Sequence, residues 1–236
     1  MISIIVPNFN KGNYIAQTIN SVINQSFCNW ELIIIDDQST DNSWEIINDF
    51  VDNTKIFAFK PETKLYGSGC RNYGFEKSRG EHVIFLDSDD LLTDNCLNER
   101  FNYFNNSKNS DFLVFPAGTF YKEIGDRKNI WKATKSNHLN LFLEHKIQWY
   151  ISSVIWKRST LLELNGFDES YMRLQDVELH TRALLLKNIK YKVFSNCTPD
   201  FYYRIDESRT KTSKNTQFIF QLQGVENYIL KISEFL

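Results

Sequence analysis

The stretch HVIFLDSDDLL, residues 82–92, decides the fold. It begins as an apolar run, which is typical of a parallel strand covered on both faces. Three carboxylates follow the run at once, those of Asp87, Asp89 and Asp90. In open α/β sheets ligands bind beyond the carboxyl ends of the strands, and a divalent ion carrying phosphates can compensate such clustered negative charge. The alternative is a solvated turn whose aspartates cap the next helix.

Strands and helices alternate along the first half of the chain. Apolar runs predict strands over 2–6, 31–35, 55–59 and 82–86, and helically spaced apolar residues lie between them. This alternation predicts an α/β fold with a mostly parallel, Rossmann-like sheet flanked by helices. Helices are expected over 14–23, 44–51, 73–77, 97–104, 138–144 and 177–187, and later strands over 112–115, 120–122, 153–156 and 190–194.

The composition is that of an ordinary soluble globular protein. The chain has 236 residues, of which 42% are hydrophobic and 15% are aromatic, so it can bury a sizeable core. No linker, repeat or low-complexity tract interrupts it. We therefore expect a single compact domain over 1–236, whose halves at 1–115 and 116–236 share one core.

Charge and cysteine content limit the class of partner and the compartment. The net charge of -2 argues against bulk binding to nucleic acid, although the segments 122–146 and 187–214 are basic. The first apolar run is too short for a signal peptide, and no stretch approaches transmembrane length. The four cysteines fit no metal-ligand spacing, which favours reduced thiols. A cytoplasmic location is expected.

A second pair of carboxylates ends another predicted strand. Asp36 and Asp37 follow the run at 31–35 and precede QSTD. If the two strands are neighbours, one crevice receives both acidic clusters, one able to accept hydrogen bonds from a base or ribose and the other able to hold a metal. Capping of the next helix is an equal alternative for this pair. A phosphohydrolase with a nucleophilic Asp would need a second Asp at position 38, where this chain has Gln38.

Four short motifs stand at predicted strand ends or helix starts. They read PNFN at 7–10, DDQSTD at 36–41, RNYG at 71–74 and DSDD at 87–90. In this order they resemble family 2 of the glycosyltransferases, which implies the GT-A fold. The later segments GFDE at 166–169, QD at 175–176 and YYR at 202–204 with Ser208 are similar to the acceptor side of that family. The resemblance implies a nucleotide-sugar-binding half at 1–115 and an acceptor-binding half at 116–236.

The resemblance also implies a donor site in the first half. The chain around Pro7, with Asn8 and Asn10, and the carboxylate of Asp37 would hold the base of a nucleotide diphosphate sugar. Uracil is the family's commonest base, so a UDP-sugar is expected. Arg71 would contact the base or the diphosphate.

The DSDD motif would serve the diphosphate. By the same resemblance, Asp89 would bind Mn²⁺ or Mg²⁺ bridging the two phosphates, while Asp87 would face the ribose or a metal-bound water. Ser88 would add a backbone contact, and Asp90 is expected to cap the following helix.

Asp176 is the expected general base. The implied reaction is displacement of nucleotide diphosphate from the anomeric carbon by an acceptor hydroxyl, and it needs a carboxylate on the opposite face of the sugar. Family members often carry Glu-Asp here, whereas this chain has Gln175 before Asp176. One base and in-line attack imply inversion of configuration. The alternative is a first-turn acid stabilised by the helix dipole.

Three further positions are weaker candidates. His180, four residues after Asp176, would share its helix face and touch the metal or diphosphate, with a plain helix histidine as the alternative. Trp149, with Tyr150, would stack on an acceptor sugar or else lie in the core. Arg204, together with Arg209 and Lys211, would close a loop over the diphosphate or form a solvated basic loop.

The C-terminal segment carries an amphipathic apolar stripe. Docking on the domain, homodimer formation and contact with the inner face of a membrane that carries a lipid-linked acceptor are the three alternatives. The stripe consists of Phe218, Ile219, Leu222, Val225, Ile229, Leu230 and Ile232.

The expected function is that of a metal-dependent, inverting glycosyltransferase of bacterial surface polysaccharide synthesis. It would add one sugar to a glycan or lipid-linked oligosaccharide, because the chain has no QxxRW-like segment of the processive synthases. The alternatives are a catalytically silent nucleotide-sugar-binding protein and a phosphohydrolase or nucleotidyltransferase.

Overall fold

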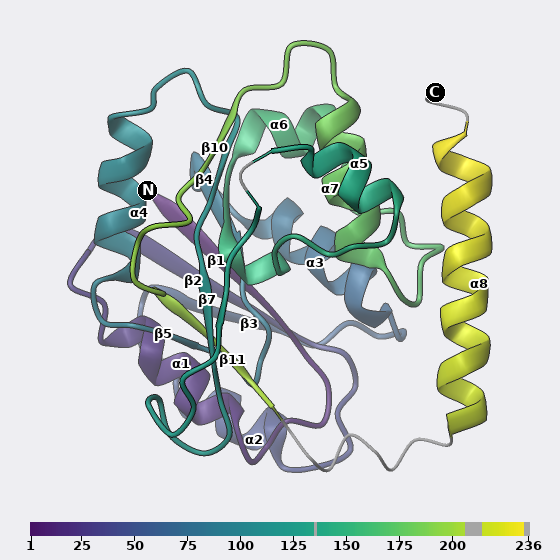
Figure 1. Cartoon of the computed structure of the whole chain (residues 1–236). Coiled ribbons are helices and arrows are strands. Elements are labelled where there is room, and N and C mark those ends of the chain that lie inside the picture. The colour runs from purple at the N-terminus through teal and green to yellow at the C-terminus, as the bar shows by residue number, and fades with distance from the viewer. Residues whose placement is uncertain (135, 206–213, 234–236) are drawn as a thin grey trace.

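A large sheet with helices on both faces and a smaller second sheet make up the protein (Figure 1). The computed structural model describes residues 1–134, 136–205 and 214–233, with the backbone alone over 214–221. The expected residues Ser208, Arg209 and Lys211 and the side chains of Phe218 and Ile219 lie outside the described residues.

The large sheet has seven strands in the order β10-β6-β9-β4-β1-β2-β3. Neighbouring strands are parallel, except that β9 runs antiparallel to both β4 and β6. The predicted mostly parallel sheet is therefore confirmed, and the insertion of β9 makes it mixed. The strands are β1 (Ile2–Asn8), β2 (Trp30–Asp36), β3 (Ile56–Phe59), β4 (His82–Phe85), β6 (Phe112–Val114), β9 (Val154–Lys157) and β10 (Tyr191–Val193).

Helices cover the large sheet on both faces because its central strands are apolar on both sides. In β1, Ile4 and Val6 point into one core cluster and Ile5 points into the other. The first cluster is closed by α1 (Ile15–Ile23), α2 (Ser43–Asn48) and α4 (Cys96–Asn105). The second face carries α3 (Tyr66–Lys77), α5 (His138–Leu143), α6 (Arg158–Glu163) and α7 (Gln175–Leu185), and a 3-10 turn, Ile151–Ser153, leads into β9.

The smaller sheet starts directly after the DSDD motif. Its order is β5-β11-β7-β8, with β11 antiparallel to β5 and parallel to β7. Of this sheet, the sequence predicted only a strand at the end of β7. β5 and β8 have two residues each and are too short to display a period, and β11, which has four residues, was not predicted as a strand. The strands are β5 (Leu91–Leu92), β7 (Ala117–Phe120), β8 (Ile130–Trp131) and β11 (Phe201–Arg204).

Gly74 lets α3 lie close against the central strand β1. A Cβ at this position would stand 2.5 Å from Cγ2 of Ile5, well inside van der Waals contact. The glycine of the RNYG motif therefore sets how deeply α3 packs. Arg71, one turn earlier on the helix, is thereby carried to the ends of the strands.

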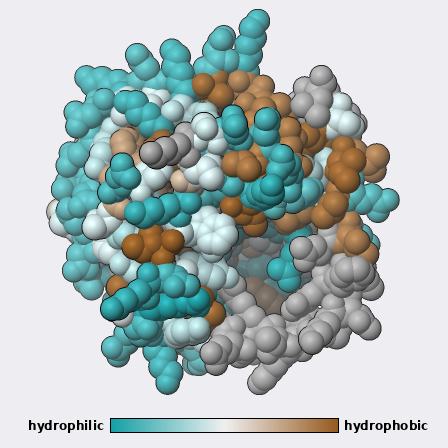
Figure 2. Space-filling model, viewed as in Figure 1, coloured by the Kyte–Doolittle hydropathy of each residue, from teal (hydrophilic) through white to brown (hydrophobic). Residues whose placement is uncertain are grey.

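The C-terminal helix α8 (Lys214–Ile232) stands at the edge of the molecule (Figure 1). It docks through buried Tyr228, whose hydroxyl lies 2.6 Å from Oγ1 of Thr181, and through buried Ile232. The prediction that the C-terminal stripe docks on the domain is thus confirmed for one side of the helix. On the other side, Leu222, Ile229 and Leu230 are exposed. Hydrophobic residues also gather on this side of the molecule in Figure 2. Over the described ranges, none of the helices combines the length and apolar character that a membrane crossing requires.

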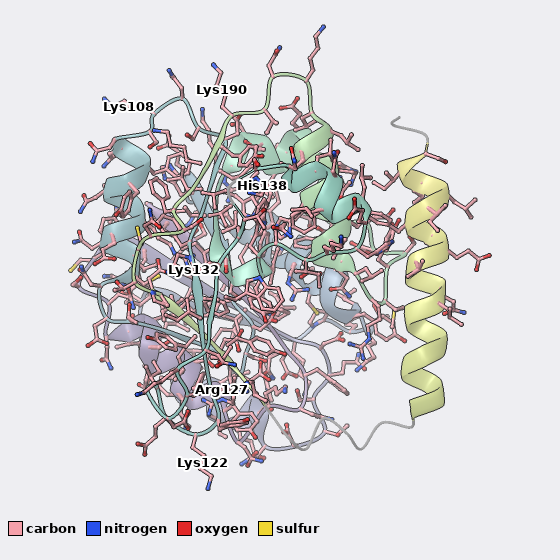
Figure 3. All side chains as sticks on the ribbon, viewed as in Figure 1. Lys108, Lys122, Arg127, Lys132, His138 and Lys190 are labelled. Carbon is pink, nitrogen blue, oxygen red and sulfur yellow. The ribbon has the colours of Figure 1, made fainter. Side chains whose placement is uncertain are left out.

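Basic side chains of the second half spread from the β7–β8 connection to β10. Figure 3 labels Lys122, Arg127, Lys132 and Lys190 along this path. Asp126 lies among them and accepts hydrogen bonds from the backbone N–H groups of Lys122 and Glu123. The charge at this connection is therefore mixed.

Candidate active site

Three strand ends meet at one edge of the large sheet. β1 lies between β4 and β2, and Asn8 at its end is in register with Asp36 at the end of β2. On the other side, Leu86 N donates to Ile5 O, so the DSDD motif begins beside the end of β1. Both acidic clusters face one crevice, as predicted, but their strands are not neighbours, because β1 with the PNFN motif lies between them.

A pocket of about 200 Å³ lies at these strand ends. Most of the predicted donor-binding residues line it, although the side chain of Asn10 instead accepts a hydrogen bond from Thr40 N at 2.8 Å. The lining residues are Pro7, Asn8, Phe9, Lys11, Asp37, Tyr66, Gly67, Cys70, Arg71, Asp87, Ser88 and Asp89.

Asp37 holds the start of α3 against the pocket. Its two carboxylate oxygens accept hydrogen bonds from Leu65 N at 2.7 Å and Tyr66 N at 3.0 Å. The alternative that this pair caps the next helix is therefore only partly correct. Asp37 does bind the N-terminus of a helix, but that helix is α3 and not α2. Asp36 is fully buried and accepts hydrogen bonds from Asn8 Nδ2 and Ser39 N.

Buried polar contacts fix the backbone of the DSDD turn. Thr18 Oγ1 lies 3.0 Å from Ser88 O and 2.9 Å from Asp90 O. Arg204 donates from Nε to Asp89 O at 2.7 Å and from its backbone N to Asp90 Oδ1 at 2.9 Å. These contacts hold the turn in one conformation.

Two expectations for this turn were wrong. Asp90 does not cap α4, which begins at Cys96, because β11 pairs with β5 and brings Arg204 N to its carboxylate. Arg204 is only 3% exposed and supports the turn from beneath, so it is not part of a solvated loop over the pocket.

Basic side chains balance the two carboxylates of the motif that line the pocket, those of Asp87 and Asp89. Lys11 Nζ lies 2.6 Å from Asp89 Oδ2, and Arg71 Nη2 lies 2.6 Å from Asp87 Oδ1. The described residues contain no group of three or more His, Cys, Asp or Glu side chains that could hold a metal ion. Lys11 is not among the site residues predicted from the sequence, and its place directly after PNFN is the signal that could have found it.

Arg71 connects the DSDD motif to the start of α7. Its Nη1 donates to Gln175 Oε1 at 2.8 Å while Nη2 binds Asp87. Gln175 is the first residue of α7, and Leu174 before it has a φ of 62°, which turns the chain sharply into the helix. Asp176 therefore stands next to a residue that Arg71 holds at the pocket.

The Asp176 carboxyl has an altered proton affinity. Burial raises its pKa above the ordinary aspartate value, and the negative charge of Asp87 adds to this effect. A hydrogen bond from Val177 N and the charge of Arg71 oppose it. A carboxylate with a raised pKa is a better proton acceptor near neutral pH than an ordinary one.

His180 and Trp149 lie in the core. The His180 ring is fully buried and stacks on Trp156 at 5.7 Å, and burial lowers its pKa to about 3. Within the described ranges neither ring nitrogen has a hydrogen-bond partner. The expectation that His180 reaches the metal or diphosphate was wrong, because His180, one helical turn after Asp176, already lies inside the protein. Trp149 is 1% exposed, so it lies in the core, as the alternative interpretation predicted, and does not stack on an acceptor sugar.

Cys70 forms part of the pocket floor as an inert thiol. Burial raises the pKa of its thiol, and the negative charge of Asp37 raises it further. All four cysteines are free thiols, as expected.

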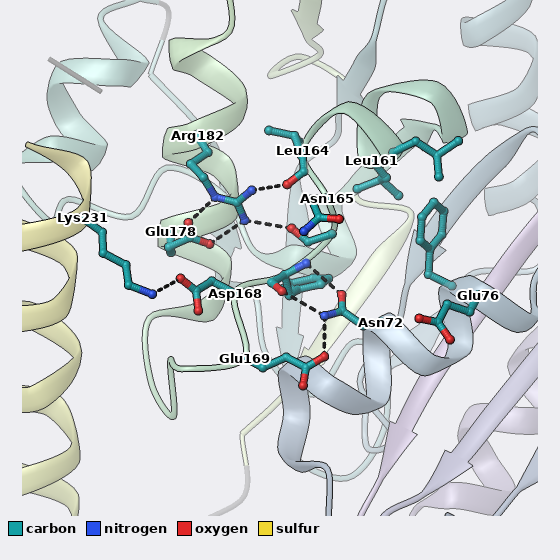
Figure 4. Close-up of a pocket in the computed structure, with 14 residues that line it drawn as sticks. Asn72, Glu76, Leu161, Leu164, Asn165, Asp168, Glu169, Glu178, Arg182 and Lys231 are labelled. Atoms are coloured by element: carbon teal, nitrogen blue, oxygen red, sulfur yellow. Dashed lines mark hydrogen bonds and ion pairs between the residues drawn. The ribbon is translucent and has the colours of Figure 1, made fainter. Parts of the chain in front are cut away.

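A larger cavity of about 810 Å³ lies on the other side of α3, beside α8 (Figure 4). Asn72 spans its wall, with Nδ2 donating to Phe167 O and Oδ1 accepting from Phe167 N. The Lys231 side chain of α8 pairs with Asp168 at its rim. The strand-end carboxylates are not part of this cavity's lining.

The fold places the chain in the GT-A class. Its structure matches that of Staphylococcus aureus TarS 1–349 in complex with UDP with a TM-score of 0.71, at 23% identity, over 87% of this chain and 60% of that one. It also matches the mannosyltransferase PcManGT from Pyrobaculum calidifontis in complex with GDP-Man and Mn²⁺, with a TM-score of 0.67, at 15% identity, over 99% of this chain and 64% of that one.

The family follows from the sequence match. The model of glycosyl transferase family 2 matches residues 3–163, and the chain belongs to this family. It is 31% identical over 211 residues to the poly(ribitol-phosphate) beta-N-acetylglucosaminyltransferase TarP of Staphylococcus aureus strain N315. The aligned region covers 87% of this chain and 56% of TarP. The chain spans about half the length of the curated relatives it matches.

Proposed function

We propose that this chain is the transferase part of an inverting glycosyltransferase. It moves one sugar from a UDP-sugar to a hydroxyl of a glycan acceptor during synthesis of a bacterial surface polysaccharide. The names of the relatives support this role, since TarP is a poly(ribitol-phosphate) glycosyltransferase and a TarS structure contains UDP. The observation that carries the proposal is the bridge from Asp87 through Arg71 to Gln175, which joins a leaving-group pocket to a candidate base.

The donor occupies the strand-end pocket in this proposal. Pro7, Asn8 and Asp37 hold the base. Lys11 and Arg71 lie at the opposite, acidic side of the pocket, where their positive charges attract the diphosphate. Residues 1–115 thus serve the donor, and residues 116–236 supply the base and the acceptor surface.

A divalent ion fits this pocket best as part of the donor complex. Asp89 offers a hard oxygen ligand of the kind that Mn²⁺ and Mg²⁺ prefer, and the remaining ligands would come from the diphosphate. Such an ion neutralises the charge of the leaving group when it is bound. The PcManGT structure, which is a complex with GDP-Man and Mn²⁺, supports this assignment.

Asp176 acts as the base. As the acceptor oxygen bonds to the anomeric carbon, its proton passes to the Asp176 carboxylate, and the bond between that carbon and the diphosphate oxygen breaks with its electron pair on the diphosphate. Arg71 and Lys11 stabilise the resulting charge. Attack opposite the leaving group inverts the anomeric configuration.

Measurement of UDP release tests the proposal. Wild-type protein is incubated with Mn²⁺, a panel of UDP-sugars and candidate glycan acceptors, and UDP is quantified with and without acceptor. Acceptor-dependent release that disappears in Asp176→Asn supports the transferase. Donor binding without any UDP release would instead favour the silent binding protein, and release of inorganic phosphate would favour a phosphohydrolase.

The cellular setting belongs to the same proposal. We place the reaction in the cytoplasm, at the inner face of the membrane when the acceptor is lipid-linked. The exposed Leu222, Ile229 and Leu230 of α8 are the surface available for membrane contact or for a second copy of the chain.

A further inference from the structure

Three aromatic side chains from distant segments meet on the second half of the protein. The ring of Tyr150 stacks on that of Tyr203 in β11, with centroids 5.0 Å apart and planes inclined by 3°. Trp131 in β8 completes the group, its ring centroid 5.3 Å from that of Tyr150 at an angle of 55°. We refer to these three residues as the aromatic platform.

Trp131 is held in place at the surface. It lies on the edge strand of the smaller sheet and is 41% exposed. Its indole Nε1 donates to Gln148 O at 3.0 Å, which fixes the orientation of the ring. A large ring that is both ordered and exposed gives binding area at little cost in conformational entropy.

The aromatic platform adjoins the proposed catalytic groups. Tyr203 precedes Arg204, which binds the backbone of Asp89 and the carboxylate of Asp90. Burial raises the pKa of Tyr150 to about 12, and the negative charges of Asp90 and Asp176 add to this effect, while Arg127 opposes it. Tyr150 stacks on Tyr203, and Tyr203 is the neighbour of the arginine that holds the DSDD turn, so the aromatic platform lies beside the support of that turn.

We propose that Trp131 and Tyr150 form a subsite that stacks on a sugar ring of the acceptor, with Tyr203 as its support. A pyranose has an apolar C–H face, which matches an aromatic ring, and a rim of hydroxyl groups. Arg127 and Lys132 (Figure 3) lie close to Trp131 in the sequence, and we assign them as the hydrogen-bond donors for that rim. The assignment of this sugar to the acceptor rests on the proposed function.

Saturation-transfer NMR with simple methyl glycosides tests the subsite without any donor. The probes are methyl β-glucoside, methyl β-galactoside and the methyl glycoside of N-acetylglucosamine. Wild-type protein is expected to transfer saturation to the C–H protons of at least one of them. Trp131→Ala should weaken that binding roughly three- to tenfold, and Trp131→Phe should retain part of it.

The control is Leu162→Ala, which removes another exposed apolar side chain, on α6, outside the aromatic platform. It should leave glycoside binding unchanged. If Trp131→Ala lowers the melting temperature, the glycoside binding of Trp131→Phe is compared with that of wild type instead. Absence of transfer to every glycoside in wild type, or equal binding by wild type and Trp131→Ala, would overturn the subsite.

Calorimetric titration of UDP separates this test from that of the proposed function. Wild type and Trp131→Ala should bind UDP equally, since Trp131 does not line the donor pocket. Failure of wild type to bind UDP would count against the proposed function, while the glycoside measurement would still report on the aromatic platform.

Discussion

Lys11 Nζ lies 2.6 Å from Asp89 Oδ2, so the carboxylate expected to bind a metal already pairs with a cation of the protein. The two residues are 78 positions apart and meet because β1 and β4 are neighbours in the sheet. A donor complex that includes a divalent ion must rearrange this pair. Once Asp89 binds the ion, the Lys11 ammonium group can bind the diphosphate without moving far from its present position.

Removal of Lys11 should expose this competition. In Lys11→Met, protein saturated with UDP is expected to bind Mn²⁺ about tenfold more tightly, because the ion no longer displaces an ammonium group that is worth about 1 to 2 kcal/mol. UDP binding should weaken, since one cation is lost. Calorimetric titrations with Mn²⁺ and with UDP measure both effects.

Lys60→Met is the matched control, because Lys60 lies 3.7 Å from Asp36 and does not line the pocket. It should change Mn²⁺ affinity little. Equal Mn²⁺ affinity in Lys11→Met and wild type would mean that Asp89 is not the metal ligand.

Asp176→Asn should separate catalysis from donor binding. Loss of the general base is expected to lower the transfer rate by about 10² to 10⁴-fold, with UDP binding unchanged because Asp176 does not line the donor pocket. In wild type the rate should fall as the pH drops through the raised pKa of Asp176. A pH series of initial rates, alongside UDP calorimetry, checks these outcomes, and an active Asp176→Asn variant would refute the assignment.

The same substitution should make the protein more stable at neutral pH. Because the folded-state pKa of Asp176 is raised, ionisation of this carboxyl costs stability once the pH exceeds its unfolded value. Asp176→Asn should therefore raise the melting temperature near pH 7, and the gain should shrink toward about pH 3, where aspartate is protonated. Thermal melts across this range measure the effect.

Asp168→Asn provides the control of opposite sign. Burial tends to raise the pKa of Asp168, but hydrogen bonds from Lys231 and Ser170 outweigh it, so its pKa is lowered. Its charge thus stabilises the fold above the unfolded pKa, and this contribution is lost as the pH falls through the folded value. Asp168→Asn should lower the melting temperature near pH 7.

Arg71→Lys should impair transfer although the charge is kept. Arg71 binds Asp87 with one terminal nitrogen and Gln175 with the other, and an ammonium group cannot hold both in this planar geometry. We expect kcat/KM to fall by about 10 to 100-fold. Arg79→Lys, at an exposed arginine paired with Glu31, is the control and should keep normal steady-state kinetics.

Gly74→Ala should destabilise the protein by about 1 to 3 kcal/mol. The new Cβ would stand 2.5 Å from the Ile5 side chain and would push α3 away from β1. Urea unfolding measures the loss. Gly69→Ala on the same helix, where the nearest atom would be Leu65 Cβ at 3.0 Å, should cost less, and equal losses would argue against this explanation.

The order of strands and helices in the first half could be predicted from the sequence by itself. Apolar runs such as that at 82–86 and helical spacings such as that at 14–23 are local patterns, and local patterns reflect burial directly. The motifs after β1, β2 and β4 likewise indicated where ligands bind, because the carboxyl ends of parallel strands share one edge.

Only the tertiary structure decided which partner each polar side chain has. Asp37 binds the start of α3, Asp90 binds Arg204 N, and Lys11 pairs with Asp89 across contacts that span many residues of chain. His180 shares a helix with Asp176, yet it faces the core because the helix enters the protein within one turn. Such pairings depend on which elements pack together, and sequence spacing does not encode that choice.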